Sequence, residues 1–136
     1  MRRFRLPVLA AAALTALGIT GCMDTASQCA CTADFRAFPL VVIDEAGLPV
    51  AEVTVTRTNL RTGRVLVPTW MGLPVPGRYI VADDGMRDEF SSEGDSLRVT
   101  GEKGDAGFVA DFVFSVPDPC RCHVVRLDGV DTVTIR

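Results

Sequence analysis

Four cysteines form two matching short patterns near opposite ends of the chain, Cys29-x-Cys31 and Cys120-x-Cys122. In extended backbone, side chains at positions i and i+2 point to the same side. Two such segments lying next to each other can form two disulfides: Cys29–Cys122 with Cys31–Cys120 if antiparallel, or Cys29–Cys120 with Cys31–Cys122 if parallel. A third connectivity, one bridge within each pair, closes a small strained ring. The spacing leaves all three pairings open.

The same four thiols offer a different chemistry, because thiolates with an adjacent imidazole can hold zinc or copper(I). His123, the only histidine, follows Cys122 directly. Zinc sites usually separate their cysteines by two to four residues rather than one. In an alternating strand, His123 would point away from Cys122, so we expect its side chain to face solvent.

The fifth cysteine, Cys22, follows a basic segment (residues 1–5) and an apolar segment (residues 6–20) that is too short to span a bilayer. Residues 19–22, Ile-Thr-Gly-Cys, resemble the lipobox of bacterial lipoproteins. The resemblance implies cleavage before Cys22, acylation of its thiol and anchoring in a membrane, with Met23 favouring the outer membrane. An ordinary secretory signal is the alternative. Either export route leads to an oxidising compartment, which favours disulfides.

Removal of residues 1–21 takes away three arginines and changes the net charge from −3 to −6. An acidic surface repels phosphate backbones, so we expect no nucleic-acid partner.

A second cluster with possible chemistry is an acidic segment, residues 83–95. Carboxylate oxygens are suitable ligands for calcium, but the spacing does not match an EF-hand loop and Arg87 adds a competing charge. A solvated acidic loop is the alternative interpretation. The six carboxylates are Asp83, Asp84, Asp88, Glu89, Glu93 and Asp95.

Trp70 and Met71 lie within residues 68–77, which contain three prolines and two glycines and cannot form a central strand. A tryptophan on a rigid exposed loop can stack on a sugar or dock a partner. The alternative is that Trp70 folds back and covers the end of the core.

Nucleophilic catalysis needs a nucleophile, a base and an orienting group. The sequence contains no G-x-S-x-G and no H-E-x-x-H. Ser91, Ser92 and Ser96 have no sequence relationship to His123 that would bring them together. We therefore expect no enzymatic activity and no cofactor.

The remaining pattern consists of short alternating or apolar segments separated by turn residues, with no sustained helical period. About eight short strands spaced near ten residues apart predict a β-sandwich or small barrel. The expected strands are residues 38–43, 52–57, 64–67, 77–83, 96–100, 108–114, 120–127 and 130–135.

One stretch carries a family resemblance. Residues 42–55 resemble the opening pattern of carboxypeptidase regulatory-like domains, V-x-D-x-x-G-x-P-V-x-x-V-x-V, and a later G-x-Y-x-V matches from Gly77 to Val81. The resemblance implies a transthyretin-like, Greek-key sandwich of about seven to eight strands. It implies no catalytic residues, since such domains are accessory modules that brace, link or bind. The matching positions are Val42, Asp44, Gly47, Pro49, Val50, Val53, Val55, Gly77, Tyr79 and Val81.

These observations predict a cleaved signal peptide (residues 1–21), a lipidated tether (22–36) and an all-β domain (37–136). The expected function is that of a non-catalytic, membrane-anchored binding or accessory module of the bacterial envelope. Its partners would be the membrane, through acylated Cys22, and an envelope protein or polysaccharide. The alternative function is a calcium- or transition-metal-binding module that uses the acidic segment or the C-x-C pairs.

Overall fold

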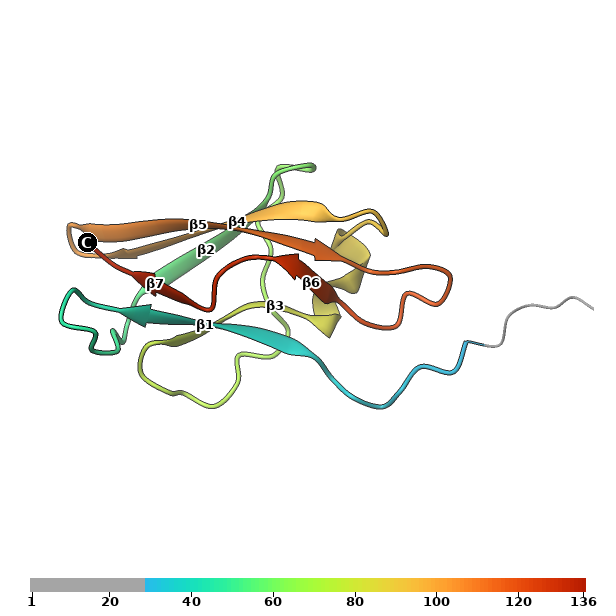
Figure 1. Ribbon diagram of the computed structural model, residues 1–136, viewed down its shortest axis with the longest axis horizontal. Helices are drawn as coiled ribbons and strands as arrows, with labels where there is room; N and C mark the ends of the chain where they lie inside the picture. The colour runs from blue at the N-terminus through green and yellow to red at the C-terminus, as the bar shows by residue number, and fades with distance from the viewer. Residues whose placement is uncertain (1–28) are drawn as a thin grey trace, which may run out of the picture.

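The computed structural model describes residues 29–136, which form two β-sheets packed face to face (Figure 1). The expected signal peptide and the acylation site at Cys22 lie outside the described residues. The elements in chain order are β1 (Ala37–Ile43), β2 (Thr54–Asn59), β3 (Arg78–Asp83), the short 3₁₀ helix η1 (Asp84–Glu89), β4 (Asp95–Lys103), β5 (Ala106–Ser115), β6 (Val125–Asp128) and β7 (Thr132–Thr134).

The smaller sheet has the order β3-β1-β7, with β1 antiparallel to β3 and parallel to β7. The larger sheet has the order β2-β4-β5-β6 and is antiparallel throughout. The all-β prediction is therefore confirmed, with seven strands among residues 29–136 in a sandwich-like arrangement. Within residues 29–136, no helix is long and apolar enough to cross a membrane.

Two of the expected strands differ in the structure. Residues 64–67 make only an isolated bridge, Thr58 to Val65, because a proline follows at once and the chain turns away. The expected strand over residues 120–127 begins only at Val125. The preceding cysteines are bonded to residues 29–31 and do not continue the ladder with β5.

The core lies between the sheets and is built from the inward positions of the alternating strands. Phe114 of β5 is central, with its ring 5.2 Å from that of Phe38, 5.5 Å from Phe90 and 6.0 Å from Phe112. Burial of each such aromatic side chain contributes roughly 1.5–3 kcal/mol. Leu97 and Val99 of β4 complete the same layer and are fully buried.

The stretch that resembles the regulatory-like family forms a tight turn followed by a connection to β2. The side chain of Asp44 accepts two backbone N–H groups of this turn, and Gly47 takes a φ of 79°, as the predicted turn requires. The hydroxyl of Tyr79 on β3 accepts a bond from Val53 N and donates one to Val50 O, each at 2.9 Å. The connection is thereby fixed to the smaller sheet.

Candidate functional site

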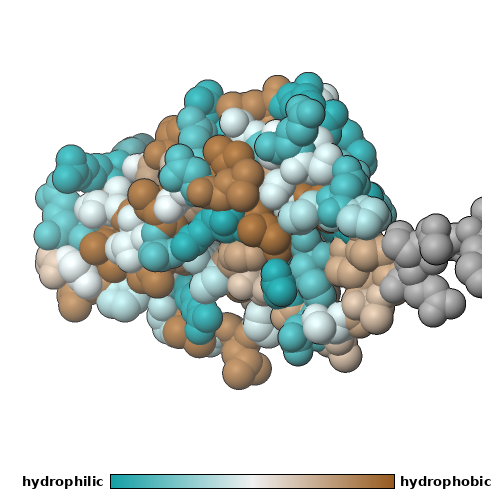
Figure 2. Space-filling model, turned by 45° about the vertical axis from the view of Figure 1, so that its right-hand side comes forward, coloured by the Kyte–Doolittle hydropathy of each residue, from teal (hydrophilic) through white to brown (hydrophobic). Residues whose placement is uncertain are grey.

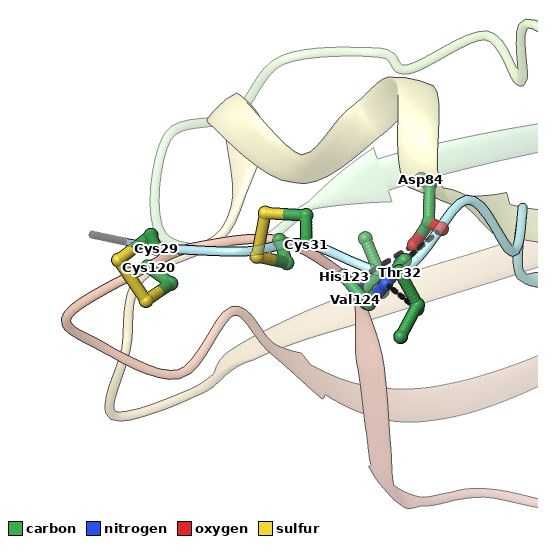
Figure 3. Close-up of a disulfide and its surroundings, with 8 residues drawn as sticks. Cys29, Cys31, Thr32, Asp84, Cys120, His123 and Val124 are labelled. Carbon is green, nitrogen blue, oxygen red and sulfur yellow. Dashed lines mark hydrogen bonds and ion pairs between the residues drawn. A yellow bond between two sulfur atoms is a disulfide. The ribbon is translucent and has the colours of Figure 1, made fainter.

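The first candidate site is the end of the molecule where the chain emerges from its amino-terminal segment. Disulfides join Cys29 to Cys120 and Cys31 to Cys122, with Cα–Cα distances of 5.3 and 5.4 Å (Figure 3). This is the parallel pairing among the three possibilities. The four sulfur atoms are bonded in two pairs, so none of them is a thiolate that could bind a metal. Two disulfides indicate an extracytoplasmic, oxidising location.

The parallel pairing places the next residue of each segment in register. Thr32 follows Cys31, His123 follows Cys122, and the Thr32 hydroxyl lies 2.8 Å from His123 Nε2 (Figure 3). The prediction that His123 faces solvent was wrong, because only 12% of its side chain is exposed. The physical reason is that residues 120–124 are not a strand. Arg121 takes a φ of 48°, which breaks the alternation and turns His123 towards the protein.

His123 Nδ1 lies 2.7 Å from a carboxylate oxygen of Asp84, the first residue of η1. The same carboxylate accepts the backbone N–H groups of Arg36 and Val124, each at 2.8 Å. Burial raises the pKa of the Asp84 carboxyl, but the bonds from Arg36, His123 and Val124 together outweigh burial, and the pKa lies below its usual value. Asp84 is therefore a buried carboxylate that joins three segments of the chain.

The hydrogen-bond roles at His123 follow from this ionisation. A carboxylate can only accept, so Nδ1 must carry the proton that it shares with Asp84. In the neutral ring, Nε2 then has a free lone pair and accepts the Thr32 hydroxyl proton. The arrangement is a hydroxyl, an imidazole and a carboxylate connected in series.

An open groove of about 550 Å³ runs beside this series. Its apolar wall includes Phe35, whose side chain is half exposed. Arg87 lines the groove and forms no ion pair within the described residues. Arg121 lines it as well, but its guanidinium donates to the carbonyls of Arg87 and Phe90.

The acidic segment contains the second group of predicted site residues, and its carboxylates are directed to separate partners. Asp83 accepts the backbone N–H groups of Trp70 at 2.7 Å and Gly85 at 2.9 Å, and its side chain is also bonded by Thr69 Oγ1. Asp95 is bonded by the Arg61 guanidinium and by Ser91 N. The Arg61 hydrogen bond lowers the pKa of the Asp95 carboxyl despite burial.

Asp88 and Glu93 are exposed, whereas Glu89 pairs with Arg64 at 2.8 Å. Within residues 29–136 there is no group of three or more His, Cys, Asp or Glu side chains arranged to hold a metal ion. The segment is also not a simple solvated loop, because Asp83, Asp84 and Asp95 are buried. Charge counting could not reveal that these side chains fix the backbone around η1.

The third candidate is an apolar loop, defined as residues 65–77, between β2 and β3. Trp70 is 49% exposed, Met71 66% and Leu73 81%, so Trp70 does not cover the core. The Trp70 ring instead meets the edge of Phe35, with a centroid distance of 6.4 Å. Figure 2 shows apolar side chains gathered between hydrophilic ones on the face it displays. The apolar loop runs below β1 in Figure 1.

Comparison of the chain with protein-family models, with curated protein sequences and with solved structures finds no match in any of the three. The resemblance to regulatory-like domains therefore stays a prediction. Sequence reasoning missed Thr32 completely. Its position in the sequence could have identified it. Thr32 and His123 each follow a C-x-C pair, so a parallel pairing of the cysteines brings the two residues side by side.

Proposed function

We propose that this chain is a bacterial envelope lipoprotein, acylated on Cys22, whose transthyretin-like Greek-key domain docks an extracytoplasmic protein through the apolar loop. The lipobox-like residues 19–22 support the anchor, and the two disulfides support an oxidising compartment. The turn at Asp44 and the Tyr79 contacts lie in the stretch that resembles the regulatory-like family.

The docking proposal rests on the exposed and uncharged side chains of the apolar loop. Residues 65–77 contain no charged side chain in a protein that is otherwise acidic. Exposed apolar groups of this size on a polar surface are typical of interaction sites. An apolar protein surface suits the loop better than a polysaccharide, because the loop supplies few polar groups to bind sugar hydroxyls.

The loop is also held rigidly, which reduces the entropy lost on binding. Asp83 bonds the backbone of Trp70 and the side chain of Thr69, while three prolines restrict the rest. A methyl group on Gly85 would lie 2.0 Å from Thr69 Oγ1, so the loop fits closely against η1.

Site-specific photo-crosslinking in intact envelopes tests the docking proposal. A photoreactive residue replaces Met71 in one strain and, as a matched control, Val109 in another; Val109 is 65% exposed on β5, away from the loop. We expect a discrete crosslinked protein from position 71 that is absent at position 109. Equal protein adducts at both positions, crosslinking at 71 to lipid alone or to glycan alone, or no adduct at either position would refute protein docking.

The anchor is tested separately. Cys22→Ser removes the thiol that would be acylated, and we expect the protein to move from the membrane fraction to the soluble extracytoplasmic fraction. Met23→Ser, one residue away, leaves the thiol in place and serves as the control. Retention of the Cys22→Ser chain in the membrane fraction with an unchanged mass would contradict acylation at this position.

A further inference from the structure

Thr32, His123 and Asp84 form a continuous hydrogen-bonded series at the edge of an open groove, with distances of 2.8 and 2.7 Å (Figure 3). We propose that Thr32 is an activated nucleophile and that this groove hydrolyses carboxylic esters of short acyl groups by acyl transfer through Thr32. The proposal is independent of docking by the apolar loop, and it departs from the sequence-based expectation of no catalysis.

The protons of this series point in one direction, from Thr32 towards Asp84. Because Asp84 can only accept, it fixes the imidazole with its proton on Nδ1 and leaves the Nε2 lone pair facing the Thr32 hydroxyl. A base within hydrogen-bond reach of a hydroxyl, itself oriented by a third group, is the geometry that activates an alcohol nucleophile. The nucleophile must contact the base and the base must contact the orienting group, and Thr32, His123 and Asp84 occupy these three positions in that order.

Exposure to solvent increases along the series from Asp84 to Thr32. Asp84 is 5% exposed and His123 12% exposed, whereas Thr32 lies on the surface. A buried carboxylate holds its charge away from water and keeps the ring in one orientation, while the nucleophile stays accessible to a substrate. A hydrogen-bond network with a purely structural role has no need for its terminal hydroxyl to be open to the groove.

The groove contains a positive charge and an apolar side chain beside Thr32. Arg87 lines the groove together with Thr32 and forms no ion pair among residues 29–136. Arg87 is exposed, so its guanidinium is free to approach a bound ester and would stabilise the oxyanion that develops when the carbonyl is attacked. Phe35 supplies an apolar wall for the acyl group, and the openness of the site to solvent suits a short acyl chain rather than a long one.

The reaction requires only the side chains of Thr32, His123 and Asp84, the ester and water. Thr32 Oγ attacks the ester carbonyl carbon while its proton passes to His123 Nε2. The tetrahedral adduct collapses, the bond to the leaving alcohol breaks, and His123 returns the proton to that alcohol. Water then attacks the Thr32 acyl ester with His123 as the base, which releases the carboxylic acid and restores the hydroxyl. Asp84 acts as a positioning residue throughout.

The test uses the full-length oxidised chain in detergent with p-nitrophenyl acetate as the probe. Release of p-nitrophenol is measured, and the site of acetylation is mapped by mass spectrometry after rapid acid quenching. Thr32→Val removes the nucleophile while keeping the shape of the side chain, and Thr32→Ser keeps a hydroxyl. Thr56→Val, at an exposed position of β2, is the matched control for the change of residue type.

We expect Thr32→Val to lower hydrolysis by at least about 100-fold, the range of acid–base assisted catalysis, with Thr32→Ser active and Thr56→Val unchanged. The acetyl group should map to Thr32 whenever an adduct is trapped. Asp84→Asn reverses the tautomer and should lower hydrolysis, while Asp95→Asn, which removes a different buried carboxylate, should not. Hydrolysis by Thr32→Val within a few-fold of the unmodified chain, an adduct confined to other residues, or equal loss in both Asp variants would overturn the proposal.

Discussion

Removal of one disulfide is expected to cost far less stability than removal of both. The two bridges each span 91 positions of sequence, and their ends are only two residues apart. Whichever bridge forms first closes a loop of about 90 residues in the unfolded chain and contributes about 4.6 kcal/mol in the chain-entropy model. The second then closes a ring of only about six residues, which contributes about 2 kcal/mol.

Removal of either disulfide alone therefore costs only the smaller of these two contributions to the free energy of unfolding. Changing Cys29 and Cys120 together to serine should lower the free energy of unfolding by about 2 kcal/mol, whereas changing all four cysteines should lower it by about 7 kcal/mol through loop closure alone. Changing Cys31 and Cys122 should cost about 1 kcal/mol more than changing the outer pair, because Thr32 and His123 lose the bridge that holds their hydrogen bond in register.

The measurement is equilibrium denaturation followed by far-ultraviolet circular dichroism, in a Cys22→Ser background that leaves residues 29–136 unchanged. For a domain of this size, about 2 kcal/mol corresponds to a lowering of Tm by roughly 9 °C. Thiol counts under denaturing conditions verify that the remaining bridge is intact. If either pair alone costs as much as half of the four-cysteine loss, the two bridges act independently and the nested-loop reasoning is refuted.

Three further outcomes follow from the described contacts. Asp84→Asn should lower the free energy of unfolding by about 2–3 kcal/mol, because one or both backbone N–H groups on the carboxylate lose a charged acceptor; an unchanged denaturation midpoint would contradict this. The pKa values of Asp84 and Asp95 are lowered in the folded protein, so both carboxylates stabilise the fold at any pH above the unfolded Asp pKa of about 3.9. That stabilisation is lost as the pH falls below this value. The denaturation midpoint should therefore be constant at about pH 5–6 and decrease below about pH 4. Gly101→Ala places a methyl group 2.0 Å from the Phe108 ring and should cost about 1–3 kcal/mol by thermal melting, while Glu102→Ala on the neighbouring exposed position should be nearly neutral.

The fold class could be predicted because alternation along β4 and β5 is strong and local. Leu97, Val99 and Phe112 are inward residues that the pattern alone identifies. The strand ends were harder, because the end of a strand depends on what the neighbouring segment does. Residues 120–124 have the composition of a strand, but their cysteines are bonded to a segment that is far away in sequence.

The site was less predictable, and for a clear physical reason. The C-x-C spacing revealed that two bridges could form side by side, but the parallel choice depends on how both chain segments approach one another. The φ of Arg121 then determines where His123 points. Arginine rarely adopts a left-handed backbone conformation, so the sequence does not indicate one at this position. Thr32 and Asp84 contact His123 only because the backbone at Arg121 turns its ring inward. Strand alternation alone therefore predicted that His123 faces solvent.

The two disulfides also determine where a pulling force enters the domain. A pull transmitted from the direction of residue 28 reaches Cys29 first and divides there, part of it crossing through Cys120 into the segment that leads back to β5. Without the bridges, the same pull would act on β1 alone, the middle strand of its sheet. Force applied at the amino-terminal end is therefore shared between the two sheets, and the sandwich resists peeling from the one end at which an anchor would load it.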